Sequence, residues 1–275
     1  MFEQIIELNG KEKGLTSIIL VGVHGNEKCG IEALEKILSN LEIEKGQVFF
    51  AYGNPEAIKL NQRFTQANLN RMFKNDEFLS EADKQSYEYN RAQFLKTYFD
   101  QSDALLDVHA SSNPISKPFI ICEPNAKGII EYLPVDLIVS GFDEVEPGGT
   151  DYYMNSIGKI GICVECGYLG NPESTQTAIK SIFAFLKARG HITNDLATNQ
   201  QSYIKVCDLY LTKTDSFKLS KPFIDFEEIS KDQIIGVDGG VEVFAKKAGL
   251  ILFARNRDKI NEEGFLFAEK KDSFI

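Results

Sequence analysis

The stretch Ile18-Ile19-Leu20-Val21-Gly22-Val23-His24-Gly25-Asn26-Glu27 decides the fold of this 275-residue chain. Its apolar half, Ile18 to Val21, is typical of a strand that is buried on both faces. Its polar half, Val23 to Glu27, precedes apolar residues at helical spacing. A histidine and a glutamate three residues apart in a strand-to-helix turn can bind one metal ion, because imidazole nitrogen and carboxylate oxygen are both zinc ligands.

The elements around this stretch predict an α/β fold. Short strands are expected within residues 1–23, a helix over 29–41 and a strand over 47–52 that ends at Gly53-Asn54-Pro55. Strand, helix and strand in succession indicate a parallel βαβ unit, and such sheets carry sites at the carboxyl ends of their strands. Periodicity predicts further elements: helices over 81–99 and 174–189, and strands over 104–109, 119–122 and 160–167.

The composition changes after Gly190. Residues 191–201 are polar and predict a linker, in which we expect His191 to be solvated. Short strands separated by frequent turns are expected beyond it, over 203–211, 233–240, 249–254 and 264–269. We therefore predict a large domain over 1–200 and a small β-barrel-like domain over 201–275.

Composition and charge exclude several classes of protein. A hydrophobic content of 43% and a charged content of 25% are those of a soluble globular chain. The net charge of −10 argues against general nucleic-acid binding, which needs a basic surface. No apolar stretch approaches the about 18 residues of a membrane span. The N-terminal stretch Met1 to Glu7 lacks a basic region followed by a long apolar run, so we expect no signal peptide.

The five cysteines are odd in number and scattered, which favours reduced thiols and a cytoplasmic protein over a disulfide framework. Cys163 and Cys166 form a CxxC pair inside a predicted strand. Strand alternation turns their side chains to opposite faces, which disfavours a metal site built on this pair.

Two of the three histidines, His24 and His109, follow apolar strands. Together with Glu27 they could form a metal site with one position left for water, whose pKa zinc lowers to about 7. The alternative is that His109 is a core histidine with its hydrogen bonds satisfied. Asp107, two residues earlier, could support the imidazole or cap a turn.

Other polar residues suggest catalysis and substrate binding. Glu165 is an acid in an otherwise apolar strand, where it could transfer protons or form a structural pair with a buried arginine. Arg63 and Arg71 could bind a carboxylate or an oxyanion, with Asn70 as an amide donor. The alternative for these three is a solvated polar loop.

Taken together, these residues resemble the succinylglutamate desuccinylase and aspartoacylase family of the zinc carboxypeptidase superfamily. The residues that carry the resemblance lie within 15–170: Gly22-Val23-His24-Gly25-Asn26-Glu27, Asn54-Pro55-Glu56-Ala57, Arg63, Asn68-Leu69-Asn70-Arg71, Asp107-Val108-His109 and Val164-Glu165-Cys166-Gly167. The resemblance implies a three-layer α/β/α sandwich around a mixed sheet, with residues 1–200 as a zinc hydrolase catalytic domain and a small C-terminal β domain.

The resemblance also implies an activity, the cleavage of an amide bond in a small anionic substrate such as an N-acyl amino acid. It implies roles for seven residues: His24, Glu27 and His109 bind one Zn²⁺, Glu165 is the general base and acid, Arg63 stabilises the oxyanion, and Asn70 and Arg71 bind the substrate carboxylate.

The chain departs from the family pattern at two places. Asn68 stands where the family usually has an aspartate, and residues 151–156 contain no arginine, although aspartoacylases place one a short way before the catalytic glutamate. Two other functions stay open, a carboxypeptidase for short peptides and a non-catalytic metal- or metabolite-binding protein. The sequence also leaves a homo-oligomer open.

Overall fold

The computed structural model describes residues 5–193, 195 and 197–274. The chain divides into two compact units, Met1–Ile138 with Pro147–Gln201, and Val139–Glu146 with Ser202–Ile275. Parts of two sequence predictions lie outside the described residues: positions 1–4 of the N-terminal stretch, and positions 194 and 196 of the linker. The assignment of separate functions to 1–200 and 201–275 stays a prediction.

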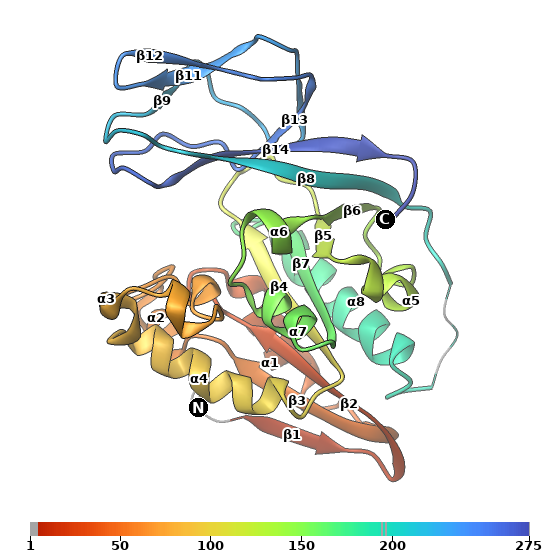
Figure 1. Cartoon of the computed structure of the whole chain (residues 1–275). Coiled ribbons are helices and arrows are strands. Elements are labelled where there is room, and N and C mark those ends of the chain that lie inside the picture. Colours follow the sequence, from red (N-terminus) through yellow and green to blue (C-terminus); the bar gives the residue numbers. More distant parts are fainter. Residues whose placement is uncertain (1–4, 194, 196, 275) are drawn as a thin grey trace. The chain divides into compact units, whose positions relative to one another are not determined.

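The first unit is built on a mixed sheet (Figure 1). Its strands run in the order β1 (Ile6–Asn9), β3 (Lys45–Tyr52), β2 (Glu12–Val21), β4 (Ala104–Ser111), β7 (Ile160–Tyr168) and β5 (Phe119–Cys122). The central strands β3, β2, β4 and β7 are mutually parallel. Strands β1 and β5 are antiparallel to their neighbours. The predicted α/β class and the parallel βαβ unit are therefore confirmed.

Helices cover both faces of this sheet (Figure 1). Helices α1 (Lys28–Ile37) and α8 (Pro172–Ala188) pack against each other on one face. Helices α4 (Tyr87–Phe99) and α7 (Thr150–Ser156) share a hydrophobic core with the other face. The result is the expected three-layer sandwich.

Residues Ile18 to Val21 of β2 are all apolar because both faces of this strand are covered. Ile18 packs on one face in a core with Leu95 of α4, whereas Val21 faces α1. A Cβ at Gly30 of α1 would lie 2.9 Å from Val21 Cγ1, so the glycine allows the helix to approach the sheet closely. Because both faces are covered, successive side chains of β2 are all buried.

The single helix predicted over 81–99 is wrong, because the chain forms α3 (Glu81–Lys84) and then restarts as α4 at Tyr87. Ser86 separates the two helices, and its side chain accepts a hydrogen bond from the Tyr89 N–H as the N-cap of α4. A serine at this position favours a new helix start over continuation. The break gives α4 an amino end of its own, where the N–H of Tyr87 donates to Gln66 Oε1 at 2.8 Å.

The prediction that His191 is solvated is also wrong. Its side chain is fully buried, with Nδ1 2.9 Å from the carbonyl oxygen of Lys45 and Nε2 2.8 Å from Ser17 Oγ. After α8 the chain returns along the amino ends of β2 and β3, and the imidazole bridges these two strands. The polar composition of 191–201 gave no indication of this contact.

Several short elements complete the first unit: α2 (Pro55–Leu60), η1 (Leu69–Arg71), η2 (Asp76–Phe78), η3 (Pro124–Ala126) and α5 (Lys127–Ile130). Strand β6 (Leu137–Ser140) includes the first residues of the second unit, and α6 (Phe142–Val145) belongs to the second unit. None of these short elements was predicted from the sequence, because elements this short show too little periodicity. Within the described residues, no helix is both long and apolar enough to cross a membrane.

The second unit is a small β domain. One antiparallel sheet has the order β8 (Ser202–Leu211), β14 (Glu263–Lys271), β13 (Gly249–Leu252) and β10 (Glu227–Ile229), and a second has the order β12 (Val241–Phe244), β11 (Ile234–Asp238) and β9 (Lys218–Leu219). The rings of Tyr210 and Phe265 stack in its core with centroids 5.0 Å apart. The four predicted strands are present as β8, β11, β13 and β14, whereas β9, β10 and β12 were missed.

Candidate active site

The turn between β2 and α1 brings two candidate ligands together. Gly22 adopts φ +66°, a left-handed conformation that ends the strand and that glycine accepts without strain. A Cβ at Gly25 would lie only 2.1 Å from the carbonyl carbon of Ala57, so the turn packs directly on α2. The Glu27 N–H donates to the His24 carbonyl oxygen at 3.1 Å. This tight turn places the His24 and Glu27 side chains on the same side.

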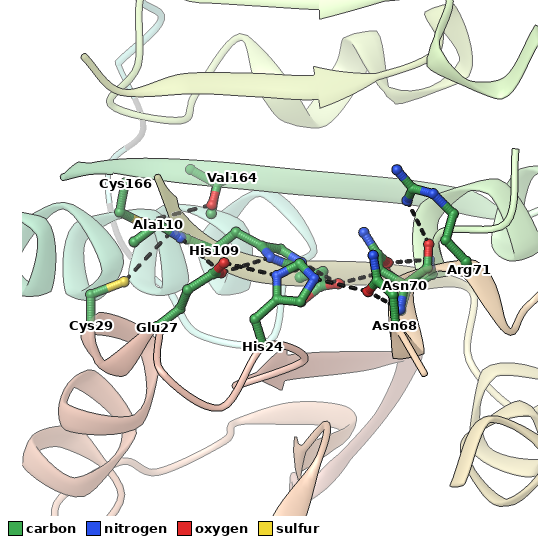
Figure 2. A network of polar contacts seen from close by, with 12 residues as sticks. His24, Glu27, Cys29, Asn68, Asn70, Arg71, His109, Ala110, Val164 and Cys166 are labelled. Atoms are coloured by element: carbon green, nitrogen blue, oxygen red, sulfur yellow. Dashed lines mark hydrogen bonds and ion pairs between the residues drawn. The ribbon is translucent and has the colours of Figure 1, made fainter. Parts of the chain in front are cut away.

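His109 joins this pair from the carboxyl end of β4. One potential ligand atom from each of His24, Glu27 and His109 lies within 4.8 Å of the others, and all three residues are buried. His24 Nδ1 is 2.8 Å from Glu27 Oε1, and His109 Nδ1 is 2.9 Å from Glu27 Oε2. Figure 2 shows the three side chains converging. They form the group of described residues best suited to hold a metal ion.

Both imidazoles direct the same nitrogen at the cluster. His24 Nε2 lies 3.1 Å from Asn68 Oδ1 (Figure 2). His109 Nε2 lies 2.9 Å from Asp107 Oδ2. These oxygens only accept hydrogen bonds, so each Nε2 carries a hydrogen, and Nδ1 is the nitrogen that each ring presents to Glu27.

His24 Nδ1 and His109 Nδ1 both face the buried Glu27 carboxylate, at 2.8 Å and 2.9 Å. A cation bound between these three groups would be held by both nitrogens and by the carboxylate. Two imidazoles and one carboxylate are also a normal zinc donor set. The residues present therefore fit a zinc ion.

The charges of the cluster agree with this fit. Burial lowers the pKa of His24 despite the nearby Glu27, so its neutral form is favoured. Burial alone would raise the pKa of Glu27, but His24 and His109 hold it well below its usual value. Burial likewise opposes the charge on His109, yet Asp107 and Glu27 together raise its pKa well above the usual value. A divalent cation would replace the His109 proton as the positive charge between these carboxylates.

Thr150 was not predicted from the sequence, although it forms a hydrogen bond to Asp107, the carboxylate that contacts His109. Thr150 Oγ1 donates to Asp107 Oδ2 at 2.6 Å, while Oδ1 of this fully buried carboxylate accepts no hydrogen bond from the described residues. The Thr150 N–H also donates to Asn70 Oδ1 at 3.2 Å. The Gly148-Gly149 pair directly before Thr150 is the sequence signal that could have indicated an unusual turn here, and Gly148 does adopt φ +111°.

Arg63 lies beside the cluster. Its Nη1 donates to Glu27 Oε1 at 2.9 Å, and its side chain keeps 42% of its surface exposed. The Arg63 carbonyl oxygen accepts a hydrogen bond from the Gly25 N–H at 3.3 Å. The loop of Arg63 is thus joined to the turn that carries His24 and Glu27.

Asn70 and Arg71 belong to η1 in the same segment. Asn68 caps this short helix by accepting the Asn70 N–H at 3.1 Å, so one side chain contacts both His24 and η1. Arg71 Nη1 donates to the Asn70 carbonyl oxygen at 2.7 Å (Figure 2). The structure therefore brings Asn70 close to the cluster through Asn68 and Thr150, and sets the Arg71 guanidinium against its own backbone.

Glu165 lies on β7, the strand next to β4, where it is the register partner of His109. Its side chain is half-buried. Neighbouring residues of paired strands are about 5 Å apart, so Glu165 and His109 share one part of the sheet. Burial, and then Glu165, raise the pKa of Cys163 well above its usual value.

The two cysteines of the CxxC pair have different surroundings. Cys166 interacts with Cys29 of α1, whereas Cys163 lies among the acids Glu165 and Asp107. All five cysteines are free thiols. The pair therefore lies on opposite faces of β7, as strand alternation requires.

Comparisons with known proteins give one consistent result. The sequence model of the succinylglutamate desuccinylase/aspartoacylase catalytic domain matches residues 13–188. The succinylglutamate desuccinylase of Pseudomonas paraeruginosa is 34% identical over 74 residues, which are 26% of this chain and 22% of that protein. The Pseudomonas putida enzyme is 33% identical over 92 residues, 32% of this chain and 28% of that protein. These matches span less than a third of the curated relatives.

Solved structures extend the likeness to both units. Succinylglutamate desuccinylases from Vibrio parahaemolyticus and Vibrio cholerae each cover 97% of this chain at 17% identity. The Vibrio parahaemolyticus structure is covered to 86% of its own chain with a TM-score of 0.80, and the Vibrio cholerae structure to 85% with a TM-score of 0.82. The ectoine utilization protein EutE (DoeB) from Ruegeria pomeroyi covers 96% of this chain, with 87% of its own chain covered, at 17% identity and a TM-score of 0.70. At these identities the likeness shows the fold alone.

Proposed function

The chain belongs to the succinylglutamate desuccinylase/aspartoacylase family, and from this premise we propose that it is a zinc-dependent hydrolase. It would cleave an amide bond in a small carboxylate-bearing substrate such as an N-acyl amino acid. One observation carries the proposal: His24, Glu27 and His109 are buried, and each brings a potential ligand atom within 4.8 Å of the others.

His24, Glu27 and His109 would hold the zinc ion, with His24 and His109 binding through Nδ1. When bound, zinc polarises a carbonyl oxygen and lowers the pKa of a coordinated water to about 7. Asn68 and Asp107 support this role because they fix the ring orientation through the opposite nitrogens.

Glu165 is the proposed general base and acid. It would take a proton from the attacking water and deliver it to the leaving nitrogen. Its position opposite His109 on the neighbouring strand supports this role. A half-buried carboxylate is accessible to substrate yet sheltered from bulk solvent.

Arg63 is proposed to stabilise the oxyanion that forms on the former carbonyl oxygen. Its guanidinium is already held beside the metal ligand Glu27. Its exposed surface leaves room for the small movement that such a contact requires.

The substrate carboxylate is proposed to bind Asn70 and Arg71. Asn70 Oδ1 accepts the Thr150 N–H, so the amide NH₂ group faces away from Thr150 and is oriented to donate elsewhere. The Arg71 guanidinium is held next to Asn70, which allows a joint contact with one anion. The neutral Asn68 supports an anionic substrate, since an aspartate there would add negative charge nearby.

A substrate panel with a matched variant tests this function. The zinc-loaded protein is expected to hydrolyse at least one N-acyl amino acid faster than short peptides. Glu165→Gln should keep zinc, measured by elemental analysis, and lose about 10³-fold or more of turnover, since the carboxylate transfers the proton. Substantial turnover by this variant with zinc present would refute the role of Glu165.

The same panel decides between the remaining functions. Preferred cleavage of peptides would make the protein a carboxypeptidase with the same metal core. Zinc binding without turnover on any substrate would favour a metal- or metabolite-binding protein.

A further inference from the structure

We propose that Glu88, outside the metal cluster, is a positioning residue that fixes the conformation of the substrate segment 63–71. The substrate part of this inference rests on the proposed function. The conformational part does not, because it concerns contacts within the protein.

Glu88 is a fully buried carboxylate in the first turn of α4. Its Oε1 accepts hydrogen bonds from Thr65 N–H at 2.7 Å, Thr65 Oγ1 at 2.7 Å and Asn54 Nδ2 at 3.1 Å. Its Oε2 accepts the Ala67 N–H at 3.2 Å and the Gln66 N–H at 3.3 Å. Five donors therefore converge on one side chain.

Three successive backbone N–H groups, those of residues 65–67, surround this carboxylate. Such an arrangement of N–H groups is a site that favours an anion. The amino end of α4 adds the positive end of its helix dipole. Burial would raise the pKa of Glu88, but the hydrogen bonds from Thr65, Asn54 and Ala67 lower it, so Glu88 is charged near neutral pH.

The loop also holds the helix in return. Gln66 Oε1 accepts the N–H of Tyr87, the first residue of α4, at 2.8 Å. Residues 61–68 form no helix or strand, and residues 61–64 are exposed. Because the loop has no ladder of its own, its middle, residues 65–67, depends on Glu88 and Gln66, while its ends are held by the contacts of Arg63 with Gly25 and of Asn68 with His24.

The position of this anchor links it to the site. Arg63 lies two residues before Thr65, and Asn68 follows Ala67 directly. One turn after Glu88, Arg91 donates to the carbonyl oxygens of Tyr52 at 2.8 Å and Gly53 at 3.0 Å, at the carboxyl end of β3. Helix α4 thus connects the end of the sheet to the loop, and Glu88 acts on substrate binding only through that loop.

The first experiment needs no activity. In Glu88→Gln one acceptor oxygen becomes an NH₂ donor that faces N–H groups, so hydrogen exchange at residues 65–67 should accelerate about tenfold or more. Exchange in β4 and the zinc content should stay unchanged. The matched control is Glu81→Gln on α3, since Glu81 is 83% exposed and pairs with Lys84, and it should change nothing. Unchanged exchange at 65–67 in Glu88→Gln would overturn the proposal.

The second experiment separates positioning from general stability. With the best substrate of the panel, Glu88→Gln should lower kcat/KM about tenfold, because the segment carries both Arg63 and the carboxylate site at Asn70 and Arg71, whereas Glu81→Gln should keep the wild-type value. A kcat/KM of Glu88→Gln equal to that of the wild type, or an equal loss in Glu81→Gln, would contradict a positioning role. If the wild type shows no turnover, the proposed function fails, and the exchange experiment still decides the role of Glu88.

A milder variant covers the case in which Glu88→Gln does not fold. Thr65→Val removes only the hydroxyl that donates to Glu88 Oε1. It should accelerate exchange at residues 66–67 about threefold. Wild-type exchange rates in a folded Thr65→Val protein would count against the anchor.

Discussion

The two imidazoles of the cluster have chemically different supports. His109 Nε2 faces the carboxylate of Asp107, whereas His24 Nε2 faces the carboxamide of Asn68. A carboxylate makes an imidazole a better electron donor to a metal than a neutral amide does. His24 should therefore be the weaker of the two nitrogen ligands.

Exchanging these supports should change zinc affinity in opposite directions. We expect Asn68→Asp to tighten zinc binding about tenfold and Asp107→Asn to weaken it about 10–100-fold, because the negative charge behind each ring is added or removed. Competition with a chelator of known affinity measures both constants. An unchanged constant for Asn68→Asp would show that the different supports have no effect.

Thr150 should contribute to stability through Asp107. In Thr150→Val the buried Asp107 loses the one hydroxyl donor that the described residues give it, which should lower the free energy of unfolding by about 1–3 kcal/mol. Thr97→Val is the control, because that exposed hydroxyl donates only to the Phe94 carbonyl oxygen, and it should cost less than about 0.5 kcal/mol. Urea unfolding of both variants gives the comparison, and equal losses would argue against a special role for Thr150.

At the scale of elements, strand ends and helix starts hold the site. His24 follows the end of β2, His109 lies near the carboxyl end of β4, β7 supplies Glu165, and the amino end of α4 holds the loop of Arg63. Toward the amino ends of the parallel strands, His191 connects two of them by contacting Ser17 of β2 and Lys45 of β3. The carboxyl ends of the strands therefore carry the candidate active site, and this histidine contributes to strand attachment on the other side.

His191 makes stability depend on pH in a defined direction. Burial lowers its pKa below the usual 6.5, while its hydrogen bond to the Lys45 carbonyl opposes this and Arg189 adds to it. A lowered pKa means that the unfolded chain binds the proton more readily, so the stabilisation is complete above about pH 6.5 and decreases as pH falls below it.

The measurement compares wild type with His191→Asn, which does not titrate. The difference in unfolding free energy between the two should be largest at pH 7.5 and smaller at pH 5.5. A difference that grows on acidification would mean that the histidine is charged in the folded protein.

At the scale of the whole molecule, all three candidate ligands belong to the first unit, and they come from segments more than 80 residues apart. A metal that joins such distant segments stabilises the folded state, because the unfolded chain does not present the three ligands together. We expect free zinc at about 100 times Kd to raise Tm by about 5–10 °C.

Two histidine variants make this test specific. His109→Asn should abolish the zinc-dependent rise in Tm, and His191→Asn, which removes another buried histidine, should keep it. Loss of the rise in both variants would indicate that zinc acts through general stability and not through the cluster.

Local sequence pattern was enough to predict the central strands of the sheet. Long apolar runs such as Ile18 to Val21 indicate burial on both faces, and polar residues directly after them must lie at one edge of a parallel sheet. That argument was enough to group His24, Glu27 and His109 as candidates. It depends only on local pattern and on the direction of parallel strands.

Three residues that support the fold or the site through remote contacts could be identified only from the folded chain. Glu88, Thr150 and His191 bind backbone groups or side chains of segments remote from them in sequence, and such contacts leave no periodic pattern. Only the packing of α4, α7 and the segment after α8 against the sheet brings these partners within hydrogen-bond distance. The physical reason is that a hydrogen bond requires proximity of two particular atoms, whereas burial of a strand requires only a run of apolar residues.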